Sequence, residues 1–260
     1  MKTIASASNP FVKRLRALAG SAKARREAGC FLVEGRRAVE SALKTGRLEV
    51  ETLVTSEAFP DELDAPEDIE RVSVPERLFD RFSGVRNAQG VLAVVRMPED
   101  PLEFDSSRGR YLLLDELRDP GNLGTLVRSA VGAGFDAVLL CGDCVDPYNP
   151  KAVRATMGTI AAARIHSVDL ADVDRMKAAG YALCIATGDA EETLYETPFG
   201  ERLVLAVGSE AHGVRPALRE RADRSFRIPL RPACESLNAA IAGSVCLFQI
   251  ACARPAPTPE

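Results

Sequence analysis

The stretch YLLLDELRDPGNLGTLVR, residues 111–128, joins a strand pattern to a helix pattern. Its first four residues form a short apolar run, which is typical of a buried strand. Pro120 and Gly121 then break the chain, and Asn122 is a residue type that caps helix amino termini. At about 100° per residue, the apolar residues of 123–131 fall on one helix face. The stretch therefore predicts a strand, a turn and a helix that packs on a sheet.

The rest of the carboxy-terminal half continues this alternation. Apolar segments that predict strands lie at residues 111–114, 137–141, 181–186, 203–207 and 225–228. Helical patterns lie between or after them at residues 123–131, 150–157, 171–179 and 236–252. Buried strands that alternate with crossover helices predict a parallel sheet covered on both faces.

The amino-terminal half indicates a separate, small α/β domain. Helical patterns at 10–25 and 36–44 alternate with apolar segments at 31–33, 50–55 and 91–95, with further pieces at 69–74 and 75–82. Residues 97–110, MPEDPLEFDSSRGR, concentrate proline, acidic residues, serine and glycine without periodicity, which is typical of a linker. We therefore expect a domain at residues 1–100 and a second domain at residues 108–254.

Composition excludes several classes of protein. The chain has 260 residues, of which 46% are hydrophobic and 27% charged, which is typical of one large or two modest globular domains. Its apolar runs are far shorter than the ~18 to 20 residues of a membrane helix. The amino terminus lacks the apolar stretch of a secretory signal, which favours a cytoplasmic location.

The cysteines favour reduced thiols over disulfides or a metal site. There are seven, an odd number, in a chain too long to need covalent cross-links. Cys141 and Cys144 form a C-x-x-C pair, but no second pair and no nearby histidine completes the four ligands of a zinc site. We expect no metal.

Charge is distributed unevenly along the chain. The formal net charge is -4, yet residues 1–50 contain eleven lysine or arginine residues and four glutamates. The basic residues that lie close together there are Lys13, Arg14, Arg16, Lys23, Arg25, Arg26, Arg36 and Arg37. Such a cluster is typical of a surface that binds a polyphosphate. The alternative for this segment alone is a solvated helix face.

Ligands of parallel α/β sheets bind beyond the carboxyl ends of the strands, so the loops after the strands are candidate sites. The first such loop leads to Arg128, which lies one helical turn beyond Gly124. Because glycine leaves room above the guanidinium, an anion could contact both Arg128 and the helix amino terminus. For this loop alone, a capped helix with a surface arginine is the favoured explanation.

Two later loops also carry unusual residues. GSEAHG, residues 208–213, brackets Glu210 with glycines directly after an expected strand, which allows a ligand to approach the backbone. IPLRPACESLN, residues 228–238, ends with Ser236 and Asn238 at the expected start of the last helix. Helix capping explains Ser236 but leaves Asn238 without a structural role.

Several common catalytic motifs are absent. The chain has two histidines and no G-x-S-x-G, so a serine hydrolase has little support. It contains no G-x-x-x-x-G-K-[ST], the phosphate loop of many nucleotide hydrolases. The glycines after residue 114 do not form the dinucleotide-binding pattern G-x-G-x-x-G.

Taken together and in this order, three motifs resemble those of the SpoU (TrmH) family of RNA ribose 2'-O-methyltransferases, in the SPOUT superfamily. They are N-x-G-x-x-x-R at 122–128, G-S-E-x-x-G at 208–213 and I-P followed by S-L-N at 228–238. DPYNPKAVRATMG at 146–158 is similar to the segment between the family's motifs. I-x-S-x-S-N-P-F-V-K-x-L at 4–15 and V-E-G-R-R at 33–37 are similar to the family's amino-terminal substrate-binding domain, which has a ribosomal-protein-like fold.

The resemblance implies a fold, a cofactor and a set of site residues. The carboxy-terminal α/β domain is then expected to contain a deep trefoil knot and to bind S-adenosylmethionine. Gly208, Ile228 and Leu237 are expected around its adenosyl group. Arg128 is expected at the reacting ribose, and the residues expected to shape the methyl-transfer site are Asn122, Glu210, Ser236 and Asn238. Family members act as homodimers.

The resemblance also implies an RNA substrate bound through the amino-terminal domain. It favours rRNA over tRNA, because many relatives that modify rRNA carry this kind of domain, and it does not specify the nucleotide. Arg128 is either the general base or a group that binds phosphate and stabilises the alkoxide, since a guanidinium with a pKa above ~12 rarely deprotonates. The rival hypotheses are an RNA-binding protein without catalysis on the same scaffold and a nucleotide-dependent enzyme of another chemistry.

Overall fold

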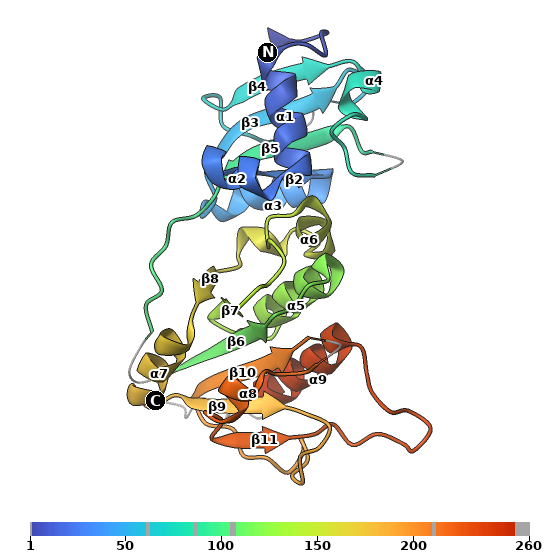
Figure 1. Cartoon of the computed structure of the whole chain (residues 1–260). Helices are drawn as coiled ribbons and strands as arrows, with labels where there is room; N and C mark the ends of the chain where they lie inside the picture. Colours follow the sequence, from blue (N-terminus) through green and yellow to red (C-terminus); the bar gives the residue numbers. More distant parts are fainter. Residues whose placement is uncertain (1, 61–62, 86–87, 105–107, 210–211, 253–260) are drawn as a thin grey trace. The chain divides into compact units, whose positions relative to one another are not determined.

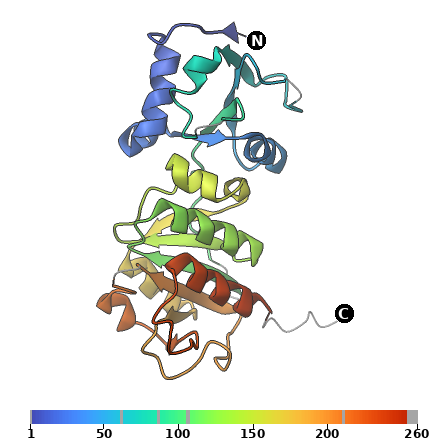
Figure 2. The same cartoon turned by 90° about the vertical axis from the view of Figure 1, so that its right-hand side faces the viewer.

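A computed structural model of the chain describes residues 2–60, 63–85, 88–104, 108–209 and 212–252. The chain divides into two compact units (Figures 1 and 2). The first unit consists of Met1–Asp100 together with Asp146–Ala162, and the second consists of Pro101–Val145 together with Ala163–Glu260. Each unit contains one sheet and its own helices.

The first unit is built on a mixed five-stranded sheet, in the order β1-β4-β3-β5-β2. The strands are β1 (Lys2–Thr3), β2 (Cys30–Glu34), β3 (Val50–Ser56), β4 (Glu70–Val74) and β5 (Val91–Arg96). Strand β3 is parallel to β4 and antiparallel to β5. The helices are α1 (Pro10–Gly20), α2 (Ala22–Ala28), α3 (Arg36–Thr45), α4 (Glu76–Phe79), α6 (Pro150–Ala155) and the short 3-10 helix η1 (Thr159–Ala161).

The single helix expected at residues 10–25 is two helices. Ser21 has extended backbone angles, and its hydroxyl accepts a hydrogen bond from the amide of Ala24, so it caps α2. Gly20 is a weak helix former and serine is a strong amino-terminal cap, which explains why the chain turns here. Val12, Leu15 and Leu18 of α1 are buried in the core of the unit. Burial of each such side chain stabilises the fold by about 1.5–3 kcal/mol.

Residues 146–162 belong to the first unit, although they lie within the stretch expected as the second domain. The guanidinium of Arg25, only 2% exposed, donates to the carboxylate of Asp146 at 2.6 and 2.8 Å and to the carbonyl oxygen of Leu18 at 2.6 Å. The rings of Phe31 and Tyr148 lie 4.6 Å apart between centroids. These contacts place α6 and η1 against β2 and α3.

The second unit contains a six-stranded sheet in the order β11-β9-β10-β6-β7-β8. Its strands are β6 (Gly109–Asp115), β7 (Ala137–Cys141), β8 (Ile165–Val168), β9 (Ala182–Ala186), β10 (Arg202–Gly208) and β11 (Arg224–Phe226). Every neighbouring pair is parallel, which confirms the predicted parallel sheet. Strand β8 was not predicted, because its short sequence IHSV carries polar residues and lies at the edge of the sheet.

Helices cover both faces of this sheet. Val173 and Met176 of α7 (Leu170–Ala178) and Leu218 of α8 (Pro216–Arg219) pack into one core cluster with the β6 and β9 side chains of that face. On the other face, α5 (Pro120–Gly132) and α9 (Ala239–Cys252) lie side by side (Figures 1 and 2).

Helices α5 and α9 approach each other closely at Gly243. A Cβ atom there would lie 2.5 Å from Cδ2 of Leu126, so a larger residue requires the Leu126 side chain to move. The hydroxyls of Ser129 and Ser244 are 2.8 Å apart across the same contact.

In the described part of the chain, no helix combines the length and the apolar character needed to cross a membrane.

Candidate functional site

The candidate site lies where β6 and β10 end side by side. Asp115, the last residue of β6, is in register with Gly208, the last residue of β10. The chain leaves β6 for β7 on one side, whereas β10 joins β9 on the other side. Such a change of direction in a parallel sheet opens a crevice beyond the strand ends, where ligands bind.

A cavity of about 230 Å³ lies beyond the carboxyl ends of these strands. It is lined by Ala186, Thr187 and Gly188 after β9, by Val207, Gly208, Ser209 and Gly213 at the end of β10, and by Ile228, Leu230, Glu235, Ser236, Leu237, Ala239 and Ala242 further along the chain. The three residues predicted to hold a cofactor, Gly208, Ile228 and Leu237, are therefore all in its wall. Ser236, predicted for the methyl-transfer site, lines the same cavity.

The loop after β10 is closed so tightly that residue 208 must be glycine. A Cβ atom on Gly208 would lie 1.9 Å from the carbonyl carbon of Gly213. Ser209 and Gly213 exchange backbone hydrogen bonds of 3.2 and 2.8 Å across the loop. Glu210, the predicted acidic residue of this loop, lies outside the described residues.

The first and third motifs meet through two asparagines. Nδ2 of Asn238 donates a hydrogen bond of 3.1 Å to Oδ1 of Asn122. Oδ1 of Asn238 accepts from the amides of Ala240 and Ile241 at 2.9 and 3.2 Å, so Asn238 caps α9. The expectation that Ser236 opens this helix was wrong, because α9 begins at Ala239 and the cap that precedes it is Asn238.

The expected cap of α5 was also wrong. Asp119, not Asn122, precedes the helix, and its carboxylate accepts a hydrogen bond of 2.8 Å from the Asn122 amide. Pro120 occupies the first helical turn, where its missing N–H costs nothing. The side chain of Asn122 is thereby left to face Asn238.

Arg128 lies on the exposed face of α5. The buried face of the helix holds Leu123, Leu126 and Val127, which fixes the side from which the guanidinium projects. Among the residues that the structure describes, its side chain has no hydrogen-bond or ion-pair partner, and it is not in the wall of the cavity. The geometry therefore unites the second and third motifs in one pocket and joins the first to them through Asn122.

Two features of the site were missed in the sequence. Thr187 and Gly188 line the cavity after β9, and the rule that ligands bind after parallel strands could have indicated them. The second feature is Asp115, which is fully buried and accepts hydrogen bonds of 2.7 Å from both the amide and Nε of Arg215. This pair fixes the chain just after the 208–213 loop to the end of β6.

The cysteines after β7 contribute to the packing of this edge. Sγ of Cys144 donates to the carbonyl oxygen of Leu114 at 3.3 Å, and Sγ of Cys141 lies 3.4 Å from Nη2 of Arg215. Burial raises the pKa of both thiols. Within the described ranges, no group of three or more histidine, cysteine, aspartate or glutamate residues is arranged to hold a metal ion.

Family models match the two halves of the chain. The model described as SpoU rRNA Methylase family matches residues 109–248, and that of an MRM3-like substrate binding domain matches residues 9–93. The parallel sheet and the pocket beyond β6 and β10 thus define a ligand-binding α/β domain joined to a substrate-binding domain. The chain belongs to the SpoU rRNA Methylase family, which confirms the resemblance found in its motifs.

Similar proteins cover almost the whole chain. The 23S rRNA (guanosine(2553)-2'-O)-methyltransferase RlmP of Bacillus subtilis is 34% identical, over 96% of this chain and 99% of its own. The 23S rRNA (uridine(2479)-2'-O)-methyltransferase of Streptomyces viridochromogenes is 30% identical, over 93% and 89%. A crystal structure of an AdoMet-bound rRNA methyltransferase from Sinorhizobium meliloti superposes with a TM-score of 0.85 at 30% identity, covering 96% of this chain and 97% of that chain.

Proposed function

We propose that the protein is an S-adenosylmethionine-dependent methyltransferase that methylates a ribose 2'-hydroxyl of rRNA. The observation that carries the proposal is the meeting of all three motifs at one edge of the parallel sheet. Gly208, Ile228 and Leu237 line the cavity there, and Asn238 binds Asn122 beside it. The relatives named above are rRNA 2'-O-methyltransferases, which supports the same reaction for this chain.

The cavity has the residues that an adenosyl cofactor needs. Ile228, Leu230 and Leu237 offer apolar contacts for a purine ring, while Thr187 and Ser236 offer hydroxyls for a ribose. Apart from its two chain neighbours, no described residue has an atom within 4 Å of where a Cβ on Gly188 would be, so the described wall is open at that residue. S-adenosylmethionine supplies the methyl group on a sulfonium, and positioning of the ribose oxygen in line with it at about 3–3.5 Å is a large part of catalysis.

Arg128 acts on the substrate in this proposal. Its exposed guanidinium, without a partner among the described residues, is available to a phosphate beside the reacting ribose and to the charge that develops on the 2'-oxygen. Asn122, Ser236 and Asn238 position the ribose, and Glu210 belongs to the same predicted set.

The first unit supplies the RNA-binding surface. Two of its clustered basic residues serve the fold, because Arg25 is buried on Asp146 and Arg14 pairs with Glu51. Lys13, Arg16 and Arg37 are among those whose side chains remain exposed. The two relatives act on guanosine and on uridine, so the proposal stops at rRNA and does not extend to a particular nucleoside. A cytoplasmic location and the family's trefoil knot are parts of the same proposal.

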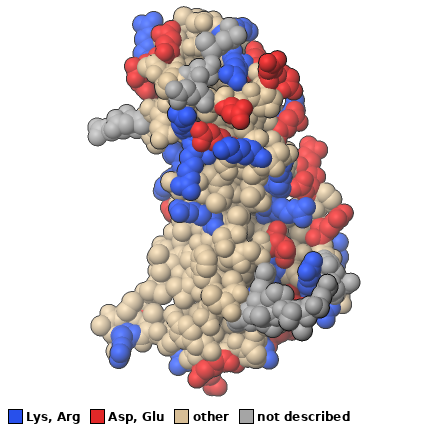
Figure 3. Space-filling view, turned by 180° about the vertical axis from the view of Figure 1, so that it is seen from behind, with Lys and Arg blue, Asp and Glu red and all other residues tan. Residues whose placement is uncertain are grey.

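A homodimer completes the proposed assembly. Helix α9 is apolar on both sides, since Gly243, Leu247 and their neighbours are buried while Ile241 and Phe248 are 53% and 48% exposed. A helix that is apolar all round is normally covered on all sides. Figure 3 shows a broad area without charged side chains on the second unit. We assign this face to a second copy of the chain.

Two measurements test the proposed function. Calorimetry with S-adenosylmethionine is expected to show binding to the purified protein, and a failure to bind contradicts the methyltransferase. Mapping of 2'-O-methyl groups in total RNA with and without the gene is expected to reveal a site that depends on the gene. Cofactor binding with an unchanged map favours the alternative, an RNA-binding protein without catalysis.

A further inference from the structure

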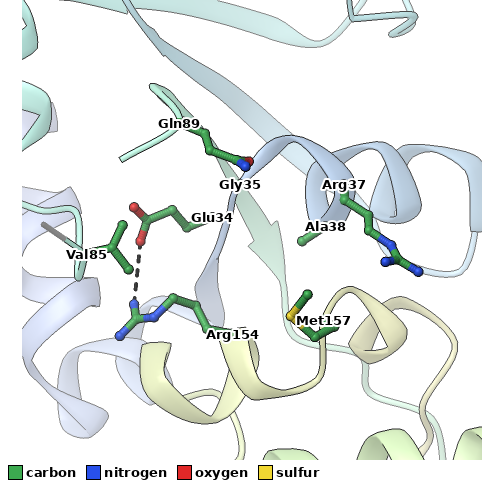
Figure 4. Close-up of a pocket in the computed structure, with 8 residues that line it drawn as sticks. All are labelled: Glu34, Gly35, Arg37, Ala38, Val85, Gln89, Arg154 and Met157. Atoms are coloured by element: carbon green, nitrogen blue, oxygen red, sulfur yellow. Dashed lines mark ion pairs between the residues drawn. The ribbon is translucent and has the colours of Figure 1, made fainter. Parts of the chain in front are cut away.

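The first unit contains a pocket whose described lining residues all differ from those of the cavity in the second unit. Its volume is about 290 Å³, and its walls come from three segments of the chain (Figure 4). The lining residues are Glu34, Gly35, Arg37 and Ala38 at the junction of β2 and α3, Val85 and Gln89 before β5, and Arg154 and Met157 at the end of α6. The stretches that match the substrate-binding model and the methylase model therefore build this pocket together.

One wall of the pocket contains a neutralised carboxylate. Glu34, whose side chain is 10% exposed, accepts hydrogen bonds from the hydroxyl of Ser83 and from the amide of Gly84, the latter at 3.2 Å. Its carboxylate also pairs with Arg154 at 3.5 Å (Figure 4). The negative charge is thus compensated inside the wall, so it does not repel an anionic ligand. The atom of Arg154 in this ion pair is Nη1, which is buried and makes no hydrogen bond within the described part of the chain.

A fixed amide forms a second polar group of the wall. Oε1 of Gln89 accepts a hydrogen bond of 2.8 Å from the backbone amide of Arg36. This bond sets the orientation of the side-chain amide and leaves its NH₂ group as a donor. An oriented donor of this kind recognises the polar edge of a planar ligand.

Exposed apolar side chains complete the walls. Met157 is 49% exposed and Val85 is 40% exposed, although both are hydrophobic. Met157 has a φ of 52°, in the left-handed region that costs a residue other than glycine about 1 kcal/mol. The fold therefore holds a methionine side chain at the pocket in spite of backbone strain. The polarisable thioether of methionine makes favourable contacts with aromatic rings.

These groups together match one particular ligand. A nucleobase has apolar faces and a polar edge, which suit Met157 and the amide of Gln89. Its phosphate suits the exposed guanidinium of Arg37 at the rim. The volume is close to the lower limit of about 300 Å³ for small-ligand pockets, which suits a ligand of the size of a single nucleotide. Sequence-selective RNA recognition commonly uses such splayed-out bases.

We propose that this pocket binds one unpaired nucleotide of the substrate RNA, with its base against Met157 and Val85 and its phosphate at Arg37. The inference rests on the proposed function and adds to it. The bound nucleotide is a recognition element separate from the methylated one, because Asn122, Arg128, Ser236 and Asn238, the predicted methyl-transfer residues that the structure describes, do not line this pocket. Substrates with a bulged or looped nucleotide are therefore preferred to continuous duplexes.

The test uses two fluorescein-labelled RNA hairpins that differ only in one bulged adenosine, with the full-length protein titrated by fluorescence anisotropy. The wild type is expected to bind the bulged hairpin more tightly. Met157→Gly removes the apolar wall and also relieves the backbone strain, so its melting temperature is expected not to fall. Its preference for the bulged hairpin is expected to fall about two- to tenfold. Met157→Leu, which keeps an apolar wall, is expected to retain most of the preference.

Arginine variants distinguish recognition of the nucleotide in the pocket from the general electrostatic attraction between the protein and RNA. Arg37→Ala is expected to weaken binding and to lower the slope of log K against log salt by about 0.7. Arg77→Ala is the matched control, because Arg77 is an exposed arginine on α4 that does not line the pocket. This control is expected to leave the preference for the bulged hairpin unchanged.

Two outcomes overturn the proposal, namely equal affinity of the wild type for both hairpins and an unchanged preference in Met157→Gly. Calorimetry with S-adenosylmethionine on the same preparations distinguishes a failure of the nucleotide pocket from a failure of the proposed methyltransferase function. If the cofactor binds and the hairpin preference is absent, the nucleotide pocket is wrong while the methyltransferase stands. If the cofactor does not bind, the methyltransferase is wrong irrespective of the hairpins.

Discussion

The side-chain amide of Asn238 holds two motifs together, because one of its atoms caps α9 while the other binds Asn122. Oδ1 accepts from the amides of Ala240 and Ile241, and Nδ2 donates to Oδ1 of Asn122 at 3.1 Å. The two asparagines are 116 residues apart in the chain. The start of α9 and the first turn of α5 are thus positioned by the same side chain.

Substitution of Asn238 can separate these two roles. Asn238→Ser keeps a good helix cap but is too short to reach Asn122, so stability is expected to stay within about 0.5 kcal/mol while methyl transfer falls. Asn238→Ala loses the cap as well and is expected to cost about 1 kcal/mol. Thermal unfolding and a single-turnover methylation assay measure the two effects. Full activity in Asn238→Ser contradicts a positioning role for the asparagine pair.

Arg128→Ala is expected to abolish methyl transfer without affecting the fold. Because the side chain is exposed and has no partner among the described residues, the free energy of unfolding should change by less than about 0.5 kcal/mol. Loss of a group that stabilises developing charge typically lowers the rate about 10²- to 10³-fold. S-adenosylmethionine affinity, measured by calorimetry, should remain near that of the wild type. A rate within a few-fold of the wild type contradicts the proposed role.

Arg215→Ala is expected to destabilise the second unit. It removes the guanidinium that pairs with the fully buried carboxylate of Asp115, including the Nε hydrogen bond of 2.7 Å, and leaves only the bond from the backbone amide of residue 215. We expect a cost of at least about 2 kcal/mol in denaturant unfolding and weaker cofactor binding. Arg221→Ala, which breaks the exposed pair with Asp174, is the control and should cost no more than about 1 kcal/mol. Equal effects of the two substitutions are inconsistent with an anchoring role for Arg215.

Phe248→Lys is expected to convert a dimer into a monomer. The ring of Phe248 lies 3.5 Å from where a Cβ on Gly132 would be, so it belongs to the combined face of α5 and α9. A charge there opposes burial against a second copy. Light scattering after size exclusion should give the mass of two chains for the wild type and of one for the variant. Tyr195→Lys, at an exposed hydrophobic residue outside these helices, should remain dimeric.

Because the phenol of Tyr148 is buried, we expect the folded state to lose stability at high pH. Burial raises its pKa from 10 to about 12, so the neutral phenol is favoured in the folded state. The stabilisation is complete below pH 10 and is lost as the pH rises through about 12, because the unfolded chain ionises first. Denaturant unfolding across this window should show a steeper decline for the wild type than for Tyr148→Phe. Parallel declines contradict the burial of this phenol.

Local patterns predicted most of the elements, and long-range contacts account for the differences. The parallel strands were found because they are continuous apolar runs, which need no knowledge of their neighbours. The caps of α5 and α9 were misassigned because Asp119, Asn122, Ser236 and Asn238 are all good capping types. Asp119 caps α5 and Asn238 caps α9, and the tertiary contact between Asn122 and Asn238 is absent from any local pattern.

The site was predictable to the extent that it follows from motifs. Gly208, Ile228, Ser236 and Leu237, which come from two of the motifs, line one cavity, and their roles in cofactor binding and methyl transfer stay predictions. The Asp115–Arg215 pair was not found, because a buried carboxylate at a strand end looks like any loop aspartate until its partner is known. The sequence also did not predict that residues 146–162 pack in the first unit, because their helical pattern does not specify which sheet they cover.

The placement of residues 146–162 has a consequence for biosynthesis. As the chain leaves the ribosome from its amino terminus, the first unit emerges well before the acidic partner of Arg25 has been made. Domains usually fold as they emerge. This unit can complete its core only after β6 and β7 have also been translated, so the two units mature together rather than one after the other.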